Sequence, residues 1–235
     1  MNRYWSYFTG RGIIDPVDDI RASNPPSNPE LLDALTADFI ARGFDLKHLI
    51  WTIVNSHTYQ RSFRTNQWNE DDKVNFSHAM PRRLTAEQLY DAIIVATGAP
   101  QKIPGVPAGF RATQLPDPKI KLSFLDLFGR PPRESPCECE RSSQVSLSQT
   151  LNLVNGPTIS NAIIHPEGLI ARLIKEKADT PTLVEEVYLS TFCRLPSEAE
   201  AKNACAYMAG IDNPAEAAQD LMWALINSPA FLFNR

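Results

Sequence analysis

The chain lacks several features that would place it in a familiar class of protein. No uninterrupted apolar run approaches the ~20 residues that a transmembrane helix requires, so the sequence predicts no membrane span. The formal net charge is -4, and Lys and Arg are scattered rather than gathered in one stripe. Because phosphate binding needs a surplus of basic side chains, we expect no nucleic-acid partner.

Cysteine and histidine are also scarce. The four cysteines are too few for a disulfide scaffold, and their spacing contains neither the doubled pairs of a zinc ribbon nor the Cys-x-x-Cys-His of covalent haem. The four histidines occur singly, without a His-x-x-x-His pair. We therefore expect no cofactor held by this chain. The first residues are aromatic and amphipathic, which is not the pattern of an export signal.

Alternating strand patterns are nearly absent, whereas helix signals recur along the whole chain. Glycines at 43 and 98 stand where helices would stop. N-capping residues, several with Glu or Gln three positions later or with a following proline, mark six expected helix starts: Ser27 with Glu30, Asp45, Thr85 with Gln88, Thr180-Pro181, Ser197 with Glu200, and Asn213-Pro214 with Glu216. The sequence therefore predicts an all-α fold, as a single multi-helix domain over residues 1–235.

Two long proline-rich regions interrupt the helices, at about residues 13–26 and 99–139. Loops of this length inside a compact domain are usually functional or disordered. The second region contains apolar side chains that can anchor it, namely Phe110, Leu115, Phe124, Leu125 and Phe128. We therefore expect ordered loops that pack on the helices.

A weak internal repeat links two of the expected helices. Residues 49–56 read Leu-Ile-Trp-Thr-Ile-Val-Asn-Ser, and residues 221–228 read Leu-Met-Trp-Ala-Leu-Ile-Asn-Ser. Trp51 and Trp223 then occupy equivalent places on helices that end in Asn-Ser. They can serve as paired aromatic platforms for a sugar or a cofactor ring, or they can fill the core. Aromatic residues at helical spacing are generally core residues, which favours the second interpretation.

The segment from Phe128 to Arg141 is the least explained by fold alone. It reads Phe-Gly-Arg-Pro-Pro-Arg-Glu-Ser-Pro-Cys-Glu-Cys-Glu-Arg, and neither a helical nor a strand period fits it. Its three arginines and three glutamates suit a bidentate network that pins the loop, whereas a pocket for anions should show surplus positive charge. We take eight of its residues as the candidate ligand- or partner-binding site: Arg130, Arg133, Glu134, Cys137, Glu138, Cys139, Glu140 and Arg141.

The two cysteines of this segment allow a second interpretation. Cys137 and Cys139 can share a soft metal, cycle as a dithiol, or each form a disulfide with Cys193 or Cys205. The last two stand in apolar helical surroundings, so we expect them to be inert core thiols. A redox or metal-binding module centred on Cys137 and Cys139 is therefore one alternative function.

Acidic residues supply the third interpretation. Carboxylates at 15, 18 and 19 can perform general acid and base chemistry on glycosidic bonds or hold calcium, but capping and turn formation explain them equally well. A hydrolase of carbohydrates or their sulfate esters would use Asp18, Asp19, Glu134 or Glu140. No nucleophile, base and oxyanion arrangement can be read from the sequence, so whether the chain is an enzyme stays open.

Several motifs in order resemble one family across essentially the whole chain. They are Asn2-Arg-Tyr-Trp, Gly10-Arg-Gly-Ile-Ile-Asp-Pro-Val-Asp-Asp, Arg21-Ala-Ser-Asn-Pro-Pro-Ser-Asn-Pro-Glu-Leu-Leu, Asp45-Leu-Lys-His-Leu-Ile, Asn55-Ser-His-Thr-Tyr-Gln, Pro81-Arg-Arg-Leu-Thr-Ala-Glu-Gln-Leu, Phe128-Gly-Arg through Cys137-Glu-Cys-Glu-Arg, and Asn227-Ser-Pro-Ala-Phe-Leu-Phe-Asn. The chain resembles domain-of-unknown-function family 1553, the C-terminal domain of planctomycete cytochrome-c-like proteins.

The resemblance implies a context rather than a reaction. Similar proteins carry an export signal, often a haem-binding cytochrome c segment, and another helical domain before this one. It implies that this chain is the C-terminal module of a larger exported protein, with haem c on an upstream domain. The expected partners are the upstream helical and cytochrome-c-like domains and a polysaccharide. The leading hypothesis is a non-catalytic accessory or interaction module associated with polysaccharide utilisation.

Overall fold

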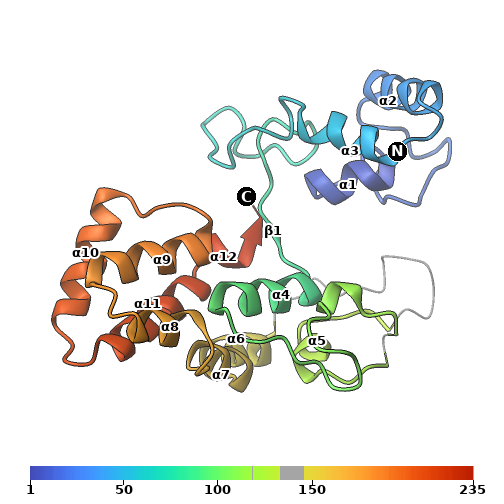
Figure 1. Ribbon diagram of the computed structural model, residues 1–235. Helices are drawn as coiled ribbons and strands as arrows, with labels where there is room; N and C mark the ends of the chain where they lie inside the picture. Colours follow the sequence, from blue (N-terminus) through green and yellow to red (C-terminus); the bar gives the residue numbers. More distant parts are fainter. Residues whose placement is uncertain (118, 133–145, 235) are drawn as a thin grey trace. The chain divides into compact units, whose positions relative to one another are not determined.

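The computed structural model describes residues 1–117, 119–132 and 146–234, and the regular secondary structure of the described chain is almost all helical (Figure 1). It divides into two compact units, Met1–Arg82 and Arg83–Asn234. The predicted all-α class is therefore confirmed. That the two units behave as one domain stays a prediction. No helix among the described residues combines the length and the apolar composition needed to cross a membrane.

The first unit contains three helices, α1 (Asn2–Thr9), α2 (Pro29–Ala41) and α3 (Leu46–Val54). Their apolar faces meet in a small core of five buried side chains: Trp5, Ile13, Leu35, Leu49 and Ile53. Phe76 packs edge-on against the Trp5 ring, with the two ring centroids 5.4 Å apart. The long segment from α3 to the end of the unit therefore returns to this core.

The start of α2 differs from the expected one by one residue. Asn28, not Ser27, is the N-cap, and its side chain accepts a hydrogen bond from the backbone N–H of Leu31 at 2.9 Å. Pro29 follows at the first helical position, where its missing N–H costs no hydrogen bond, so the cap lies just before it. Ser27 instead donates its hydroxyl to the carbonyl of Ile13 at 3.0 Å.

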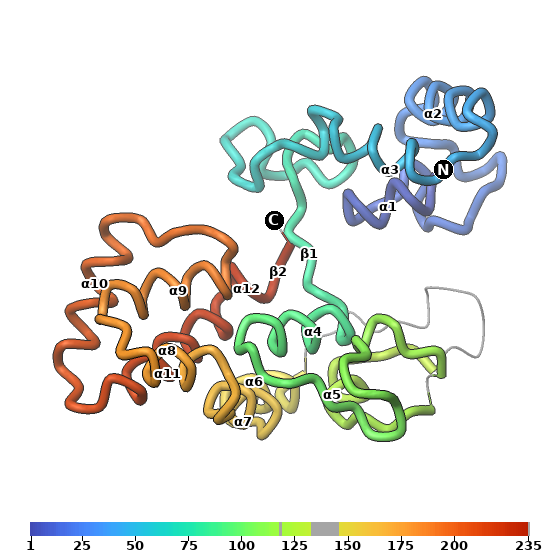
Figure 2. The backbone as a smooth tube through the Cα atoms, in the orientation of Figure 1, coloured from blue at the N-terminus to red at the C-terminus, as the bar shows by residue number. Residues whose placement is uncertain are grey.

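The second unit holds the remaining helices around a larger core, and Figure 2 traces its path. Two short strands pair in a two-stranded sheet. Helix α4 packs against α5, α7 and α9, and α11 packs against α8, α9 and α10. In chain order the elements are β1 (Arg82–Arg83), α4 (Ala86–Thr97), η1 (Ala112–Gln114), α5 (Ser123–Leu127), α6 (Leu147–Asn155), α7 (Pro157–Ile163), α8 (Leu169–Lys175), α9 (Thr180–Phe192), α10 (Glu198–Ala209), α11 (Pro214–Ile226), α12 (Pro229–Leu232) and β2 (Phe233–Asn234).

Most of the expected caps of this unit are confirmed. Complete capping boxes begin α4 at Thr85 and α10 at Ser197, and Gly98 ends α4 in the left-handed conformation. The cap of α9 is Asp179, one residue earlier than expected, because its side chain accepts from the backbone N–H at position 182. Asn213 caps α11 as expected.

The described part of the second proline-rich region is ordered, as expected. A buried carboxylate, Asp91 of α4, receives hydrogen bonds from Gln101 at 2.8 Å, from the N–H of Ala112 at 2.7 Å, and from the N–H and hydroxyl of Thr113 at 3.1 and 2.8 Å. Four of the five expected anchors are buried, and Phe110 is exposed. One polar group on a core helix thus holds the loop in place.

Candidate functional site

One of the eight residues of the expected site lies in the described part of the chain. That residue is Arg130, and the other seven lie outside the described residues: Arg133, Glu134, Cys137, Glu138, Cys139, Glu140 and Arg141. The site therefore has to be built from the residues that flank segment 133–145, and these are described on both sides.

Arg130 is turned into its own unit. Its side chain is 7% exposed, and it forms an ion pair with Asp126 of α5 at 2.6 Å. The guanidinium also donates to the carbonyl of Ile120 at 2.8 Å, and the backbone N–H of Arg130 bonds to Leu125 at 2.9 Å. Planar, multidentate contacts of this kind fix a guanidinium in one orientation. At this position the arginine pins the chain to the body of the second unit.

The two ends of the loop meet at one glutamine. Gln149 on α6 is 5% exposed, and its Nε2 donates to the carbonyl of Leu127, the last residue of α5, at 2.9 Å. Helices α5 and α6 are neighbours in the trace of Figure 2. At Gln149 the chain is therefore back at the place where α5 ends with Leu127.

Arg83 holds this glutamine from the other side. Its Nη1 donates to Gln149 Oε1 at 2.7 Å, and its guanidinium carbon lies 5.4 Å from the centroid of the Phe128 ring. Burial lowers the pKa of Arg83 from its ordinary value. We call Arg83, Leu127, Phe128 and Gln149 the loop root. The Phe128 ring in turn stacks on Phe124, with centroids 4.2 Å apart.

The two arginines of segment 81–83 both donate hydrogen bonds to neutral acceptors. Arg83 donates to a neutral amide, and Arg82 donates to the carbonyl of Tyr7 within the first unit. Burial lowers the pKa of Arg82 as well. A half-buried guanidinium with a neutral acceptor positions other groups rather than offering a free charge to solvent.

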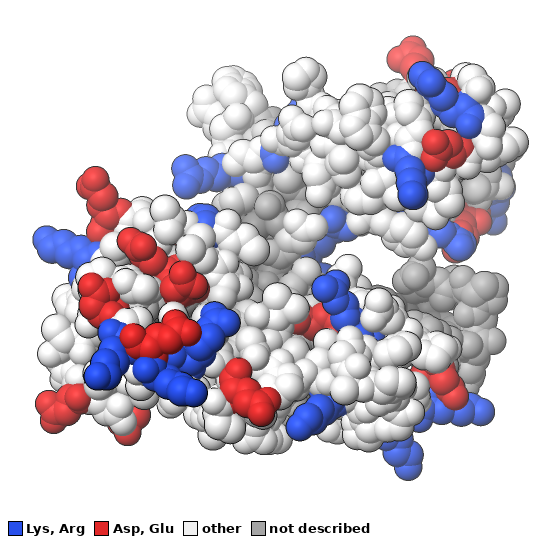
Figure 3. Space-filling view, viewed as in Figure 1, with Lys and Arg blue, Asp and Glu red and all other residues white. Residues whose placement is uncertain are grey.

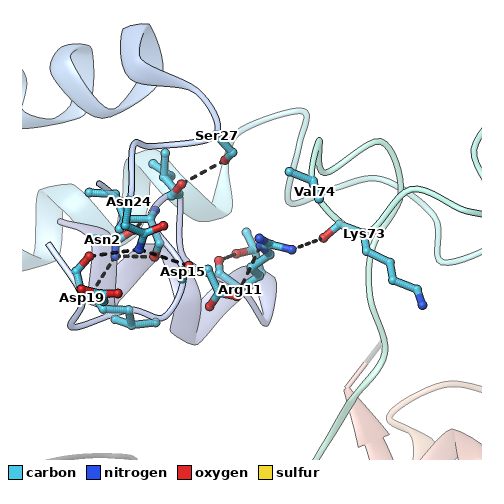
Figure 4. Close-up of polar contacts among 12 residues, drawn as sticks. Asn2, Arg11, Asp15, Asp19, Asn24, Ser27, Lys73 and Val74 are labelled. Carbon is cyan, nitrogen blue, oxygen red and sulfur yellow. Dashed lines mark hydrogen bonds and ion pairs between the residues drawn. The ribbon is translucent and has the colours of Figure 1, made fainter. Parts of the chain in front are cut away.

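The acidic loop of the first unit, residues 15–19, carries the carboxylates of the hydrolase interpretation. Each has an arginine partner: Asp15 lies 3.6 Å from Arg11, Asp18 pairs with Arg3, and Asp19 pairs with Arg21 at 2.7 Å. Figure 4 shows Arg11 beside Asp15 and reaching the carbonyl of Lys73, with which it bonds at 3.1 Å. Each of these carboxylates is thus bound to an arginine of the first unit.

Asn2 at the start of α1 fixes this loop, a role that the sequence motifs did not indicate. It is 6% exposed, and its Nδ2 donates to the carbonyls of Ile14 and Val17 at 2.8 and 2.9 Å while its Oδ1 accepts from the N–H of Ile14 at 2.9 Å (Figure 4). A Cβ added to Gly12 would overlap the carbonyl of Ile14. Sequence spacing does indicate that Asn2 is buried. It stands three residues before the buried Trp5, so the two side chains share one face of α1.

Metal and redox chemistry gain no support from the side chains that can be placed. Within residues 1–117, 119–132 and 146–234, no group of three or more His, Cys, Asp or Glu side chains could hold a metal ion. Glu134, Glu140, Cys137 and Cys139 lie outside these ranges, so the interpretations that depend on them stay predictions.

The expected burial of the other two cysteines is wrong for one of them. Cys193 is exposed, while Cys205 is half-buried and packs against the core of the second unit. Both thiols are free. Cys193 is the C-cap of α9 with φ 54°, so it has left the helix and its apolar face.

The expectation that the two repeated tryptophans fill the core is also wrong. Trp51 is 63% exposed and Trp223 is 39% exposed. The repeated helix ends do match: Asn55 and Asn227 each donate a side-chain N–H to the carbonyl of the tryptophan four residues earlier, at 2.8 and 2.9 Å. Both asparagines are right-handed helical. The Asn-Ser pair therefore ends each helix, as the sequence indicated, and the tryptophans lie on the surface.

Charges on the visible face of the second unit are mixed. Figure 3 shows Lys and Arg side chains next to Asp and Glu over this unit. One such contact is the bidentate pair of Arg194 with Glu200, with both N–O distances 2.8 Å. Positive and negative side chains, which the composition contains in similar numbers, thus lie next to each other as local pairs.

Comparison with known proteins adds a family. No curated protein and no solved structure matches the chain. Residues 1–208, which include the acidic loop and the loop root, match the family described as PSD1, protein of unknown function (DUF1553). Since this match covers well over half of the sequence, the chain belongs to the DUF1553 (PSD1) family.

Proposed function

We propose that the chain is a non-catalytic interaction module that binds a partner through the loop of residues 128–141. The partner would be an upstream helical or cytochrome-c-like domain of the same exported protein, in which haem c is carried upstream. The process served would be polysaccharide utilisation. The resemblance of the sequence to exported, cytochrome-c-linked proteins supports this context.

The observation that carries the proposal is the closed loop root. Gln149 bonds to Leu127 on one side and accepts from Arg83 on the other, so both ends of the loop are fixed at one place. Fixing the ends of a binding segment before it meets its partner lowers the conformational entropy lost on binding. A root built from directional hydrogen bonds also fixes the direction in which the chain leaves the body.

The non-catalytic part of the proposal rests on the acidic loop. Asp15, Asp18 and Asp19 each have an arginine partner, and Asn2 holds the backbone between them. Carboxylates paired in this way support the fold, because a general base needs a free lone pair directed at substrate. This supports assigning the loop to the fold of the first unit.

The experiment replaces loop residues in the full-length protein. Arg133→Ala, Glu134→Ala and Cys137→Ser together should remove cross-links between residues 128–141 and the upstream domains, measured by mass spectrometry, while far-ultraviolet circular dichroism stays unchanged. A matched triple variant with the same residue types, Arg64→Ala, Glu70→Ala and Cys193→Ser, should keep these cross-links. Persistence of the cross-links in the loop variant would contradict the proposal.

Activity provides an independent check. The full-length protein should not turn over plain or sulfated polysaccharides. Turnover that is lost in Asp18→Asn or Asp19→Asn, with unfolding unchanged, would overturn the non-catalytic assignment in favour of a carboxylate hydrolase.

A further inference from the structure

A groove between α10 and α11 lies apart in sequence from both the loop root and the acidic loop. Its volume is about 500 Å³, within the range of small-molecule sites. The residues that line it are Ala204 and Tyr207 from α10, with Asp220, Leu221, Trp223 and Ala224 from α11. The groove thus combines an apolar floor, two aromatic rings and one carboxylate.

Both aromatic side chains are held by hydrogen bonds although they are exposed. The Tyr207 hydroxyl donates to Asp220 Oδ2 at 2.8 Å, and the Trp223 indole N–H donates to the carbonyl of Val154 on α6 at 3.0 Å. Tyr207 is 49% exposed. Large exposed rings fixed by contacts to neighbouring helices are pre-organised for a ligand, since their rotamers are already restricted.

Among the described residues that line the groove, Asp220 is the one with a charged side chain. The hydrogen bond to Asp220 raises the pKa of the Tyr207 phenol. An anion would therefore be repelled from the groove.

We propose that this groove binds a small organic cation of the alkylammonium type. The negative faces of the Tyr207 and Trp223 rings attract a cation, its methyl groups pack on the apolar floor, and Asp220 supplies the counter-charge. A sugar fits less well, because its many hydroxyl groups would face apolar walls with one carboxylate as partner. A purely apolar ligand would cover Asp220 and leave its charge unpaired.

The test uses choline chloride as the probe and its neutral isostere 3,3-dimethylbutan-1-ol as the control, in buffer of matched ionic strength. Proton–nitrogen NMR follows the indole signals of the four tryptophans, with Trp223 assigned by its loss in Trp223→Phe. Choline should shift the Trp223 signal with saturation and leave Trp51 unchanged. The neutral isostere should bind about fivefold more weakly or worse, from the missing cation–π attraction.

Two substitutions separate charge from shape. Asp220→Asn keeps the side-chain volume and should weaken choline binding about fivefold. Tyr207→Phe keeps the ring and releases Asp220 from its hydrogen bond, so choline binding should be retained, whereas Tyr207→Leu should reduce it by a similar factor. Circular dichroism melting confirms that each variant is folded.

Three results would each overturn the proposal. The first is equal affinity for choline and its neutral isostere, which would make the groove merely apolar. The second is an Asp220→Asn variant that binds choline as tightly as the unaltered chain, since losing a surface charge pair should weaken binding up to about fivefold. The third is a Trp51 shift that matches the Trp223 shift, which would indicate unspecific contact with exposed indoles.

Discussion

Replacing Gln149 with leucine should open the loop root. Leucine keeps an apolar volume on α6 but removes both the bond to the Leu127 carbonyl and the acceptor for Arg83. The half-buried guanidinium and the carbonyl then lose their partners together. The variant tests whether this one side chain closes the loop.

The magnitude follows from the two bonds. A neutral hydrogen bond such as Gln149 to Leu127 contributes about 1 kcal/mol net, and a bond to a charged group such as Arg83 contributes about 2 kcal/mol. The loss should therefore be about 3 kcal/mol in the free energy of local opening, or roughly a hundredfold in an equilibrium constant. Arg83 keeps its contact with the Phe128 ring in the variant, so the loss in the free energy of local opening should not exceed this value.

Hydrogen exchange measured by mass spectrometry localises the effect. In Gln149→Leu, peptides covering residues 123–132 and 146–155 should exchange roughly a hundredfold faster, while peptides from α9 and α11 stay protected. Asn152→Ala is the matched control on the same helix, because Asn152 Oδ1 is buried without a hydrogen-bond partner among the described residues. In this control variant, the hydrogen exchange of the same peptides should stay unchanged or become slower. Faster exchange on one side of the loop alone, or on neither, would refute the idea that Gln149 closes it.

Three further outcomes are expected. Asn2→Leu should lower the urea stability of the first unit by about 3 kcal/mol, followed by Trp fluorescence, because three buried hydrogen bonds are lost. Arg194 holds the pKa of Glu200 at about 2. The stability that this pair contributes is therefore present above pH 4.5 and is lost as the pH falls toward 2. In Arg194→Ala, the pKa of Glu200, measured by NMR, should return toward 4.5. Thiol labelling of the folded chain should modify Cys193 rapidly and Cys205 slowly.

Local signals account for the parts of the fold that the sequence predicted correctly. The capping boxes at Thr85 and Ser197 involve residues three positions apart, so their geometry is contained in the motif itself. The same logic placed the start of α2 at Ser27, one residue early, because the rule for proline at the first helical position was not applied to Pro29.

The exposure of Trp51 was available from helical geometry. Leu49 and Ile53 are four residues apart and both are buried, which defines the inner face of α3. Trp51 stands two residues from each, about 200° around the helix, and therefore lies on the outer face. Assigning aromatic residues to the core as a class overlooked this angle.

The loop root could not be read in the same way. Arg83 and Gln149 are separated by 66 positions, and the bond between Gln149 and Leu127 joins helices on either side of a long loop. No spacing rule links residues so far apart, and a lone glutamine on a short helix carries no motif. Contacts of this kind follow from how α4, α5 and α6 pack, which the sequence pattern does not specify.

A polar loop root has a physical advantage over an apolar one. Holding Leu127 next to Gln149, 22 positions along the chain, has an entropic cost of loop closure. The length-dependent part of this cost is roughly 3 kcal/mol, and it is offset when the second unit folds. Binding of a partner to residues 128–141 would therefore not include this loop-closure cost. Apolar contacts could close the loop equally well, but they would allow the ends to slide. The donor and acceptor of Gln149 each have one partner, so the two ends are held in a single register. Directional closure is therefore what an interaction loop requires of its root.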